Sequence, residues 1–197
     1  MVSMVKRMTE LSMYKTEIEQ QRKEKDWFFK NHLQSPLSPE QKKSFKGLSY
    51  FPINEELRFI IPLHIHSDKK TIKVEDSKGG IQTYLRWGEF KFTINDSTYT
   101  LQAYKNHPSD SNLWVPFRDE TNNKETYGAG RYLDLTEGLD TINDKWILDF
   151  NLSYNPFCAY SETYVCPFIP PENWLEIPIN GGEKAYKPNN SEEVENH

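Results

Sequence analysis

Apolar side chains near the start of the chain recur at the spacing of one helical face. Met4, Met8 and Leu11 are separated by intervals of four and three residues, and this spacing predicts an amphipathic helix over residues 4–29. The apolar stripe lapses in the middle of this segment and resumes with three aromatic residues. We therefore expect the helix to contact the rest of the protein through its ends and to leave residues 17–25 largely in solvent.

A second helix signal follows in the sequence Ser-Pro-Glu-Gln. Ser38 suits a helix N-cap, Pro39 suits the first helical position, and Gln41 can complete a capping box. Gly47 is typical of a helix end. The sequence therefore predicts a short second helix between these two signals.

From Leu57 onward the hydrophobic period changes to two, which predicts β-strands. Pro62 interrupts the first strand, and an Asn-Asp-Ser sequence at residues 95–97 is typical of a hairpin turn. The expected strands cover residues 57–66, 71–75, 81–87, 89–94, 98–104, 113–117, 131–135, 146–151 and 174–179. Short strands at near-regular spacing predict a mainly β fold, with an antiparallel sheet that closes into a barrel or packs as a barrel-like sandwich.

The length of 197 residues suits one domain, which we place at residues 45–186, between a helical extension (residues 1–44) and a disordered acidic tail (residues 187–197). The formal charge is −5 and the basic residues are scattered, so the electrostatics do not favour nucleic-acid binding. No apolar run approaches the roughly 20 residues of a membrane span, and the start of the chain lacks the apolar core of an export signal. We therefore expect a cytoplasmic protein that does not bind membranes.

The residues that most often serve as nucleophiles or metal ligands are few. Cys158 and Cys166 lack the close spacing of zinc sites, so we expect two thiols, with a disulfide or a metal role as the alternatives. His64 and His66 share one face of an expected strand, but no third ligand accompanies them, so we expect solvated histidines. No motif for a nucleotide, flavin or haem occurs. The sequence predicts neither a metal nor a cofactor.

Charged side chains gather among aromatic residues in the sequence WVPFRDETNNKETYGAGRYLD. Arg118 and Arg131 each carry a planar fork of donors that binds a carboxylate or a phosphate. Either arginine could anchor an anionic ligand; alternatively, they pair with Asp119 and Asp134 and brace the intervening loop. The glycines after Tyr127 do not match a nucleotide-binding loop, since no helix follows, and they favour a bulge or a positive φ.

A second group of polar residues lies in the sequence LDFNLSYNPFCAY. Asp149 and Asn151 share one face of an expected strand and, with Tyr154, could present several hydrogen-bonding groups to one pocket. They could equally satisfy the backbone of the irregular loop that follows. Further along, Glu172 and Glu183 are candidate partners of Asp149, because glycoside hydrolysis needs a pair of carboxylates.

These sequences resemble one known family. The patterns PFRD-T, TYGAGRYLD, LDFN, YNP, CAY, Cys-Pro, PPEN and GEK-Y are typical of an uncharacterised family, domain of unknown function 1684. The resemblance covers about Phe45 to Tyr186 and departs from the family pattern at Phe157 and Gly181, where Pro and Ala are usual. The family has no established activity, so the resemblance implies which residues recur and not what they do.

The function that we expect is the binding of a small polar or anionic ligand by the β domain. One alternative is a hydrolase that uses Asp149, Glu172 or Glu183 as acid or base. Another is a non-catalytic structural or interaction protein in which the charges are braces. The sequence does not indicate an oligomeric state. The predicted ligand-binding residues are Arg118, Asp119, Tyr127, Arg131, Asp149, Asn151, Tyr154 and Lys184.

Overall fold

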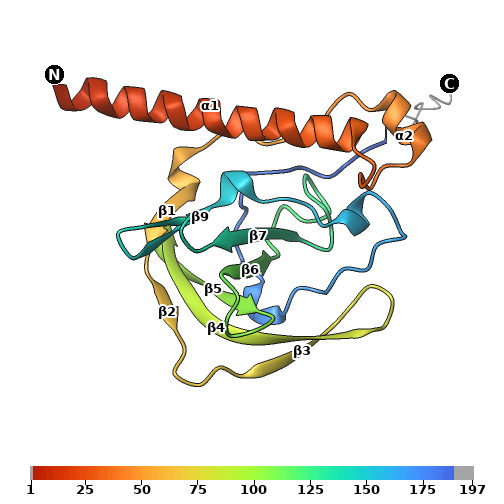
Figure 1. Cartoon of the computed structure of the whole chain (residues 1–197). Coiled ribbons are helices and arrows are strands. Elements are labelled where there is room, and N and C mark those ends of the chain that lie inside the picture. Colours follow the sequence, from red (N-terminus) through yellow and green to blue (C-terminus); the bar gives the residue numbers. More distant parts are fainter. Residues whose placement is uncertain (1, 189–197) are drawn as a thin grey trace.

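The structure is a computed structural model, and it describes residues 2–188. Two α-helices, α1 (Val2–Asn31) and α2 (Pro39–Ser44), precede a β-rich body (Figure 1). The strands are β1 (Arg58–Ile61), β2 (Leu63–Ile65), β3 (Thr71–Glu75), β4 (Ile81–Ile94), β5 (Ser97–Lys105), β6 (Asn112–Phe117), β7 (Arg131–Thr136), β8 (Thr141–Ile142) and β9 (Lys145–Asp149). Short 3-10 helices occur at η1 (Glu55–Leu57), η2 (Phe150–Leu152), η3 (Phe157–Ala159) and η4 (Pro171–Asn173).

The strands form two antiparallel sheets. One has the order β1-β9-β8 and the other has the order β2-β4-β5-β6-β7, with β3 also paired to β4. The predicted mainly β, antiparallel fold with two helices is confirmed, whereas the barrel is not: across residues 2–188 the two sheets do not close into one. Pro62 marks the division, because it lies between β1, which pairs with β9, and β2, which pairs with β4. A proline has no N–H for a ladder hydrogen bond, so it suits a point where the chain leaves one sheet for the other.

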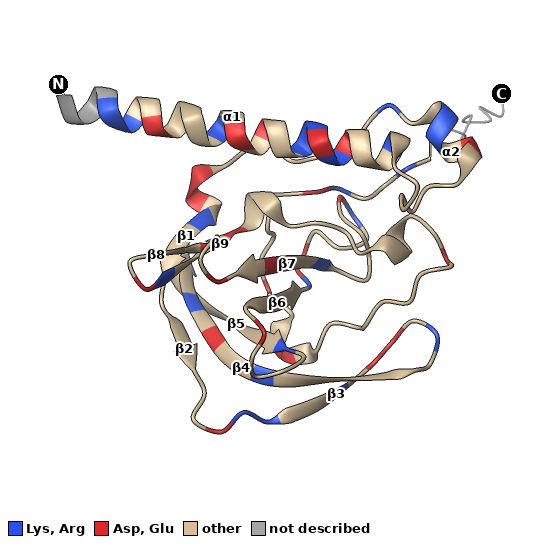
Figure 2. Cartoon of the chain, viewed as in Figure 1, with Lys and Arg blue, Asp and Glu red and all other residues tan. Residues whose placement is uncertain are grey.

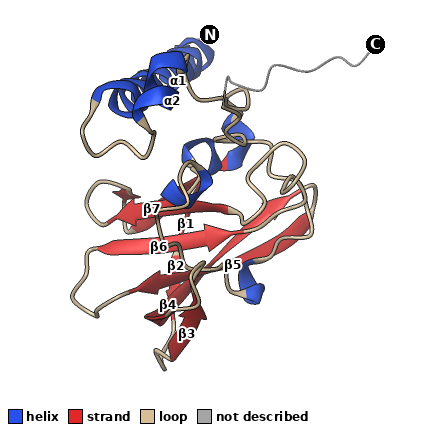
Figure 3. Ribbon diagram, turned by 90° about the vertical axis from the view of Figure 1, so that its right-hand side faces the viewer, coloured by secondary structure: helices blue, strands red, loops and turns tan. Residues whose placement is uncertain are grey.

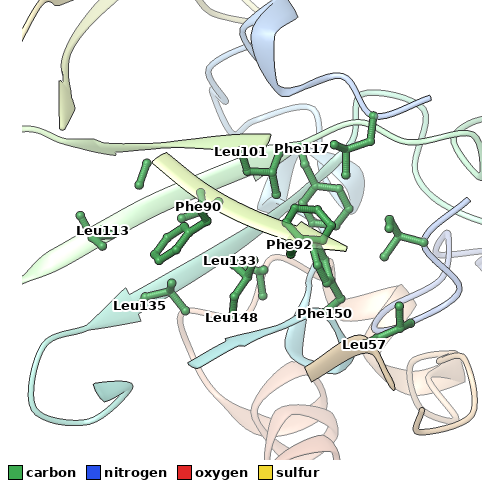
Figure 4. Packing of buried hydrophobic residues seen from close by; sticks show 14 of the residues in the cluster. Leu57, Phe90, Phe92, Leu101, Leu113, Phe117, Leu133, Leu135, Leu148 and Phe150 are labelled. Atoms are coloured by element: carbon green, nitrogen blue, oxygen red, sulfur yellow. The ribbon is translucent and has the colours of Figure 1, made fainter. Parts of the chain in front are cut away.

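The main hydrophobic core lies between the two sheets (Figure 4). Alternate residues of β6 and β7 enter it, since successive side chains of a strand face opposite sides. Its most buried members include Phe90, Leu101, Leu113, Val115, Phe117, Leu133, Leu148 and Phe150. The intervening residues of the same strands, among them Trp114 and Tyr132, therefore point to the outer face of the larger sheet.

The segment predicted as a last strand, residues 174–179, forms no regular strand. Leu175 donates its N–H to the backbone oxygen of Arg118 (2.8 Å), whereas Ile179 donates its N–H to a carboxylate oxygen of Asp119 (3.2 Å). Because one of these acceptors is a side chain, the ladder of a sheet does not form. The strand prediction is wrong here, although the alternating apolar residues of the segment still enter the core.

Helix α1 lies along the side of the body where β7 forms the sheet edge (Figures 1 and 3). Its contact face is formed by Tyr14, Ile18, Arg22, Lys25 and Phe29. Met8 is 63% exposed while Ile18, near the middle, is 2% exposed, so the predicted contact through the ends alone is wrong. The sequence conceals this face because Arg22 and Lys25, two of the charged residues along α1 (Figure 2), bury their stems and bond to the body through their charged ends.

Helix α2 begins with the predicted capping box. The Ser38 hydroxyl accepts a hydrogen bond from the Gln41 N–H (3.2 Å), and the Ser38 N–H donates to the Gln41 side chain (2.8 Å). Neither helix within residues 2–188 is long and apolar enough to cross a membrane. Most of the tail predicted at residues 187–197 lies outside the described residues.

Candidate functional site

A groove of about 820 Å³ lies on the outer face of the larger sheet, and we call it the outer groove. Aromatic side chains form its floor and polar side chains form its rim. Its lining includes Tyr84, Tyr104, Trp114, Tyr132 and Tyr154, together with Lys105, Asp110, Asn112, Asp134, Thr136 and Pro167. Small-molecule sites have volumes of about 300–1,000 Å³, so the outer groove has the size of a ligand site.

The register of the strands brings the side chains of the groove floor onto one face of the sheet. Trp114 on β6 lies opposite Tyr104 on β5 and opposite Asp134 on β7. Tyr154, beyond the edge of the sheet, exchanges backbone hydrogen bonds with Tyr132 of β7 (2.9 and 3.0 Å). Paired positions on one face of a sheet stand close together, so these side chains form a continuous surface across the outer face.

A β-bulge brings β4 into the same surface. The register of β4 against β5 shifts between Arg86 and Gly88. After the bulge, Phe90 and Phe92 face the core, whereas Tyr84, an even number of residues earlier, faces the outer groove. Without the bulge, the period of two would place Tyr84 on the core side.

The aromatic rings of the floor contact one another in sequence. Tyr84 stacks on Trp114, with centroids 4.6 Å apart and planes 27° apart. Trp114 meets Tyr132 edge to face at 5.2 Å, and Tyr132 meets Tyr154 in the same way at 6.0 Å. Each such pair contributes about 0.5–1.5 kcal/mol beyond its buried area. The floor is therefore a packed surface that is formed before any ligand arrives.

The tyrosine hydroxyls of the floor are already bonded to the protein. Tyr104 donates to a carboxylate oxygen of Glu172 (3.0 Å), and Tyr132 donates to the backbone oxygen of Pro167 (2.7 Å). Burial raises the pKa of both tyrosines above the ordinary value. These tyrosines are thus uncharged and their hydroxyls are engaged. The ring surface open to a ligand comes mainly from the half-buried Trp114 and Tyr154, because Tyr84, Tyr104 and Tyr132 are buried.

Asp134 is the exposed carboxylate of the floor. One of its oxygens accepts a hydrogen bond from the Tyr154 hydroxyl, and the other has no hydrogen-bond partner within residues 2–188. Its surface is accessible from the groove, but the surrounding side chains limit its hydration, which raises the pKa of Asp134. Asp134 therefore presents one oxygen that is available to a hydrogen-bond donor of a ligand.

The rim of the outer groove adds neutral polar side chains and one lysine, whose ammonium is already bonded to the protein. Thr136 donates its hydroxyl to the Asn112 side chain (3.0 Å). The Lys105 ammonium donates to the backbone oxygen of Asp110 and lies 4.3 Å from the centre of the Trp87 ring. Lys105 is buried, and its ammonium is held by these two contacts, so it is poorly placed to bind an incoming anion.

Arg131 and Asp119, two of the predicted ligand residues, form a buried ion pair. Their side chains are 0% exposed, with 2.9 Å between the guanidinium nitrogen and the carboxylate oxygen. Arg131 also donates to the backbone oxygens of Ile179 (2.8 Å) and Gly181. Burial lowers the pKa of Arg131, and Asp119 opposes this shift. The pair has the geometry of a structural brace, with no surface that a ligand could reach.

Three other predicted residues lie in separate surroundings. The Arg118 guanidinium lies 4.7 Å from the centre of the Trp174 ring. The Tyr127 hydroxyl donates to the Cys158 sulfur (3.8 Å). Lys184 lies over the Phe51 ring, and it lines a different cavity, which includes Ser49 and Tyr186. Lys184 shares the Phe51 ring with Arg131, whose guanidinium lies 5.9 Å from the ring centre, but these predicted residues do not line one cavity with Arg131.

Asp149 and Asn151 hold helix α1. The Tyr14 hydroxyl of α1 donates to a carboxylate oxygen of Asp149 (2.7 Å) and accepts a hydrogen bond from the Asn151 amide (2.9 Å). Arg58 lies 3.7 Å from the same carboxylate oxygen. Burial raises the pKa of Asp149. These residues therefore form a polar network between helix and body, outside the outer groove.

The three acids considered for hydrolysis do not share one cavity. Glu172 is bonded to Tyr104, Asp149 is bonded to Tyr14, and Glu183 is bonded to Lys25 (2.7 Å). A pair of carboxylates must flank the same bond of a substrate to act as acid and base. The described residues do not offer that arrangement for these three side chains.

Cys158 and Cys166 contact each other near one end of the outer groove. Both are free thiols, and the Cys158 N–H donates to the Cys166 sulfur (3.4 Å). A hydrogen bond from Cys166 lowers the pKa of Cys158 to about 7, whereas its interaction with Cys158 raises the pKa of Cys166. Pro167, next to Cys166, lines the outer groove. Elsewhere, His66 bonds to the Gln102 side chain (2.7 Å), while His64 is exposed.

Of the eight predicted ligand residues, only Tyr154 lines the outer groove. The sequence prediction missed Tyr84, Tyr104, Trp114 and Tyr132, because it selected site residues by charge and hydrogen-bonding groups. A sequence pattern in β6 and β7 could have identified two of them, because Trp114 and Tyr132 alternate with aliphatic residues. Such aromatic residues lie on the face opposite the core, where polar residues are more usual.

Comparisons with known proteins agree with this fold. The solution NMR structure of an uncharacterized protein from Haloarcula marismortui is 36% identical in sequence, with a TM-score of 0.68, over 89% of this chain and 96% of that chain. No curated protein matches the chain. The family model described as "Protein of unknown function (DUF1684)" matches residues 43–184. The resemblance seen in the sequence is thus confirmed, and the chain belongs to this family of proteins of unknown function, DUF1684.

Proposed function

We propose that this protein binds a small, neutral, polyhydroxylated ligand, such as a sugar, in the outer groove. The observation that carries the proposal is the packed aromatic floor with the available carboxylate oxygen of Asp134 beside it. Ligand sites typically combine aromatic walls with a few placed polar groups. The outer groove has this composition and a suitable volume of about 820 Å³.

The chemistry of the lining favours this class of ligand. The C–H face of a sugar ring packs on apolar ring surface, and Trp114 is half-buried beside the buried Tyr84 and Tyr132. A carboxylate accepts hydrogen bonds from adjacent hydroxyl groups, which is the role proposed for Asp134. An anion is disfavoured here because Lys105 is already engaged and Asp134 carries negative charge.

The test is titration with neutral mono- and disaccharides, followed by isothermal calorimetry and by chemical-shift changes of the Trp114 indole. Asp134→Asn keeps an acceptor for the Tyr154 hydroxyl but removes the charge. We expect it to weaken binding by about 10- to 100-fold, since hydrogen bonds to a charged group contribute about 1.5–3 kcal/mol. Asp96→Asn is the matched control, because Asp96 is exposed in the β4–β5 turn at a positive φ that Asn also adopts.

Two outcomes would count against the proposal. One is the absence of any saturable shift of the Trp114 indole across the saccharide panel. The other is equal affinity of the Asp134→Asn and Asp96→Asn variants for a saccharide that does bind. The second outcome would place the ligand elsewhere on the protein.

A further inference from the structure

A second cavity lies between helix α1 and the body, separate from the outer groove. Its volume is about 180 Å³. Ile18, Gln21, Arg22 and Lys25 line it from α1, and Tyr50 and Glu183 line it from the body. We call it the helix cavity. Tyr154 lines both cavities, and the Lys25 ammonium lies 5.0 Å from the centre of its ring.

Arg22 presents an unused fork of donors in the helix cavity. Its Nη1 donates to the backbone oxygen of Phe51 (3.1 Å), and its guanidinium lies over the Tyr50 ring at 4.4 Å. Its Nε and Nη2 atoms are buried and have no hydrogen-bond partner within residues 2–188. The N–H groups of these two atoms lie along the same edge of the guanidinium, which is the geometry that binds a carboxylate in two places at once.

Glu183 and Tyr50 add two further unpaired atoms. One carboxylate oxygen of Glu183 accepts from Lys25 (2.7 Å) and from the Asn155 N–H (3.2 Å). Its other oxygen and the Tyr50 hydroxyl are buried without a partner in the described part of the chain. Buried polar atoms are nearly always hydrogen-bonded. Several unpaired atoms around one cavity therefore indicate that something else completes their bonding.

The charges around the helix cavity favour an anion. Arg22 and Lys25 contribute two positive charges, and Glu183 contributes one negative charge. Asp149, which faces α1 from the body, is matched by Arg58 at 3.7 Å. The side chains that line the cavity thus carry one positive charge in excess, and Glu19 of α1 is a further negative charge near Arg22. A small anionic ligand would balance the excess within the lining.

We propose that the helix cavity binds a short hydroxycarboxylic acid. Its carboxylate occupies the Nε–Nη2 edge of Arg22 and accepts a hydrogen bond from the Tyr50 hydroxyl. Its own hydroxyl donates to the free oxygen of Glu183. The small volume restricts the ligand to a few heavy atoms, and glycolate and lactate are probes of this size.

The test compares the thermal stability and the native mass of the protein with glycolate, lactate, acetate or chloride at equal millimolar concentration. We expect glycolate or lactate to raise the Tm more than acetate, chloride to have no effect, and a glycolate adduct to appear in the native mass spectrum. Equal shifts with glycolate and acetate would overturn the hydroxyl contact with Glu183. Equal shifts with glycolate and chloride, or no shift and no adduct at all, would overturn the site.

Substitutions of Arg22 and Tyr50 test whether the ligand binds in the helix cavity. Arg22→Lys keeps the positive charge but loses the fork, so it should abolish the shift, whereas the exposed Arg7→Lys on the same helix should retain it. Tyr50→Phe keeps the ring that stacks on Arg22 and removes only the hydroxyl, so it should weaken glycolate binding several-fold in a folded protein. Retention of wild-type binding by both Arg22→Lys and Tyr50→Phe would overturn the proposal.

Discussion

Arg131 and Asp119 meet at 2.9 Å in a place where neither side chain has any exposed surface. The pair also bonds to the backbone: Arg131 donates to Ile179 O (2.8 Å), and Asp119 accepts from Thr121 N–H (2.9 Å). Arg131 Nε is buried without a hydrogen-bond partner within residues 2–188. The pair thus ties the segment after η4 to the start of β7, the strand that carries Tyr132 and Asp134. The sequence left two interpretations of this charge pattern open, an anion site and an internal brace, and the geometry of Arg131 and Asp119 is that of a brace.

Removal of one partner should therefore be costly. We expect Arg131→Met to lower the free energy of unfolding by about 3–5 kcal/mol, because it leaves Asp119 as an unpaired buried charge. Urea denaturation followed by tryptophan fluorescence measures this loss. Arg118→Met is the matched control, since Arg118 is half-buried over Trp174 and should lose about 1 kcal/mol or less. Equal losses would contradict the different roles given to the two arginines.

The polar network beneath α1 predicts a second stability effect. Tyr14→Phe removes a hydroxyl that is bonded to both Asp149 and Asn151. We expect a loss of about 1–3 kcal/mol, because one oxygen of the buried Asp149 carboxylate loses its hydrogen bond, while the Asn151 amide keeps Asn54 O and Asp149 as acceptors. Hydrogen exchange should show the loss as faster opening of α1.

Tyr99→Phe is the control for this change. Tyr99 contacts the Phe92 ring (6.0 Å), but its hydroxyl has no hydrogen-bond partner within residues 2–188. Tyr99→Phe should therefore lower the free energy of unfolding only slightly. Unchanged exchange of α1 in Tyr14→Phe would show that the network does not hold the helix.

Glu183 predicts a dependence of stability on pH. Burial raises its pKa in the folded protein, and Lys25 opposes this shift. The folded state then binds more protons than the unfolded state at pH values between the ordinary and the raised pKa. The contribution of Glu183 is therefore complete below the ordinary pKa and is lost as the pH rises through the raised one. Asp149 shifts in the same direction.

Urea denaturation over a pH series tests this effect. We expect the free energy of unfolding to fall with rising pH in that window, by at most about 1.4 kcal/mol per pH unit for one group. Glu183→Gln should flatten the profile, whereas Glu176→Gln, at an exposed position, should not. A profile that is the same in Glu183→Gln and in the wild type would exclude Glu183 as its source.

The two thiols should differ in reactivity. Cys158 is half-buried with a pKa of about 7, while the pKa of the buried Cys166 is raised. The thiolate is the reactive form, so iodoacetamide near neutral pH should label Cys158 first. Mass spectrometry of labelled peptides gives the order. Cys166→Ala should slow the labelling of Cys158, because it removes the hydrogen bond that lowers the pKa of Cys158. Faster or equal labelling of Cys158 in this variant would contradict that explanation of the lowered pKa.

Local patterns in the sequence determined much of the secondary structure. The capping box at Ser38 and the turn after β4 are formed by neighbouring residues, and Asn95 and Asp96 adopt the positive φ values of 49° and 62° that a tight hairpin needs. The apolar alternation of β6 and β7 likewise predicted strands. These features depend on contacts between residues close in the chain, so a sequence shows them directly.

The tertiary structure alone decided which polar residues form braces and which aromatic residues form a site. The local sequence left the pairing of Arg131 with Asp119 as one alternative, and the fold decided it by bringing Ile179 and Gly181 around the same guanidinium. The outer groove depends on a bulge in β4 that turns Tyr84 outward. The helix cavity depends on the docking of α1 against residues more than one hundred positions later, as in the pair of Lys25 and Glu183. A sequence shows the period of a strand or helix, but the partner of each face is set only when distant segments pack together.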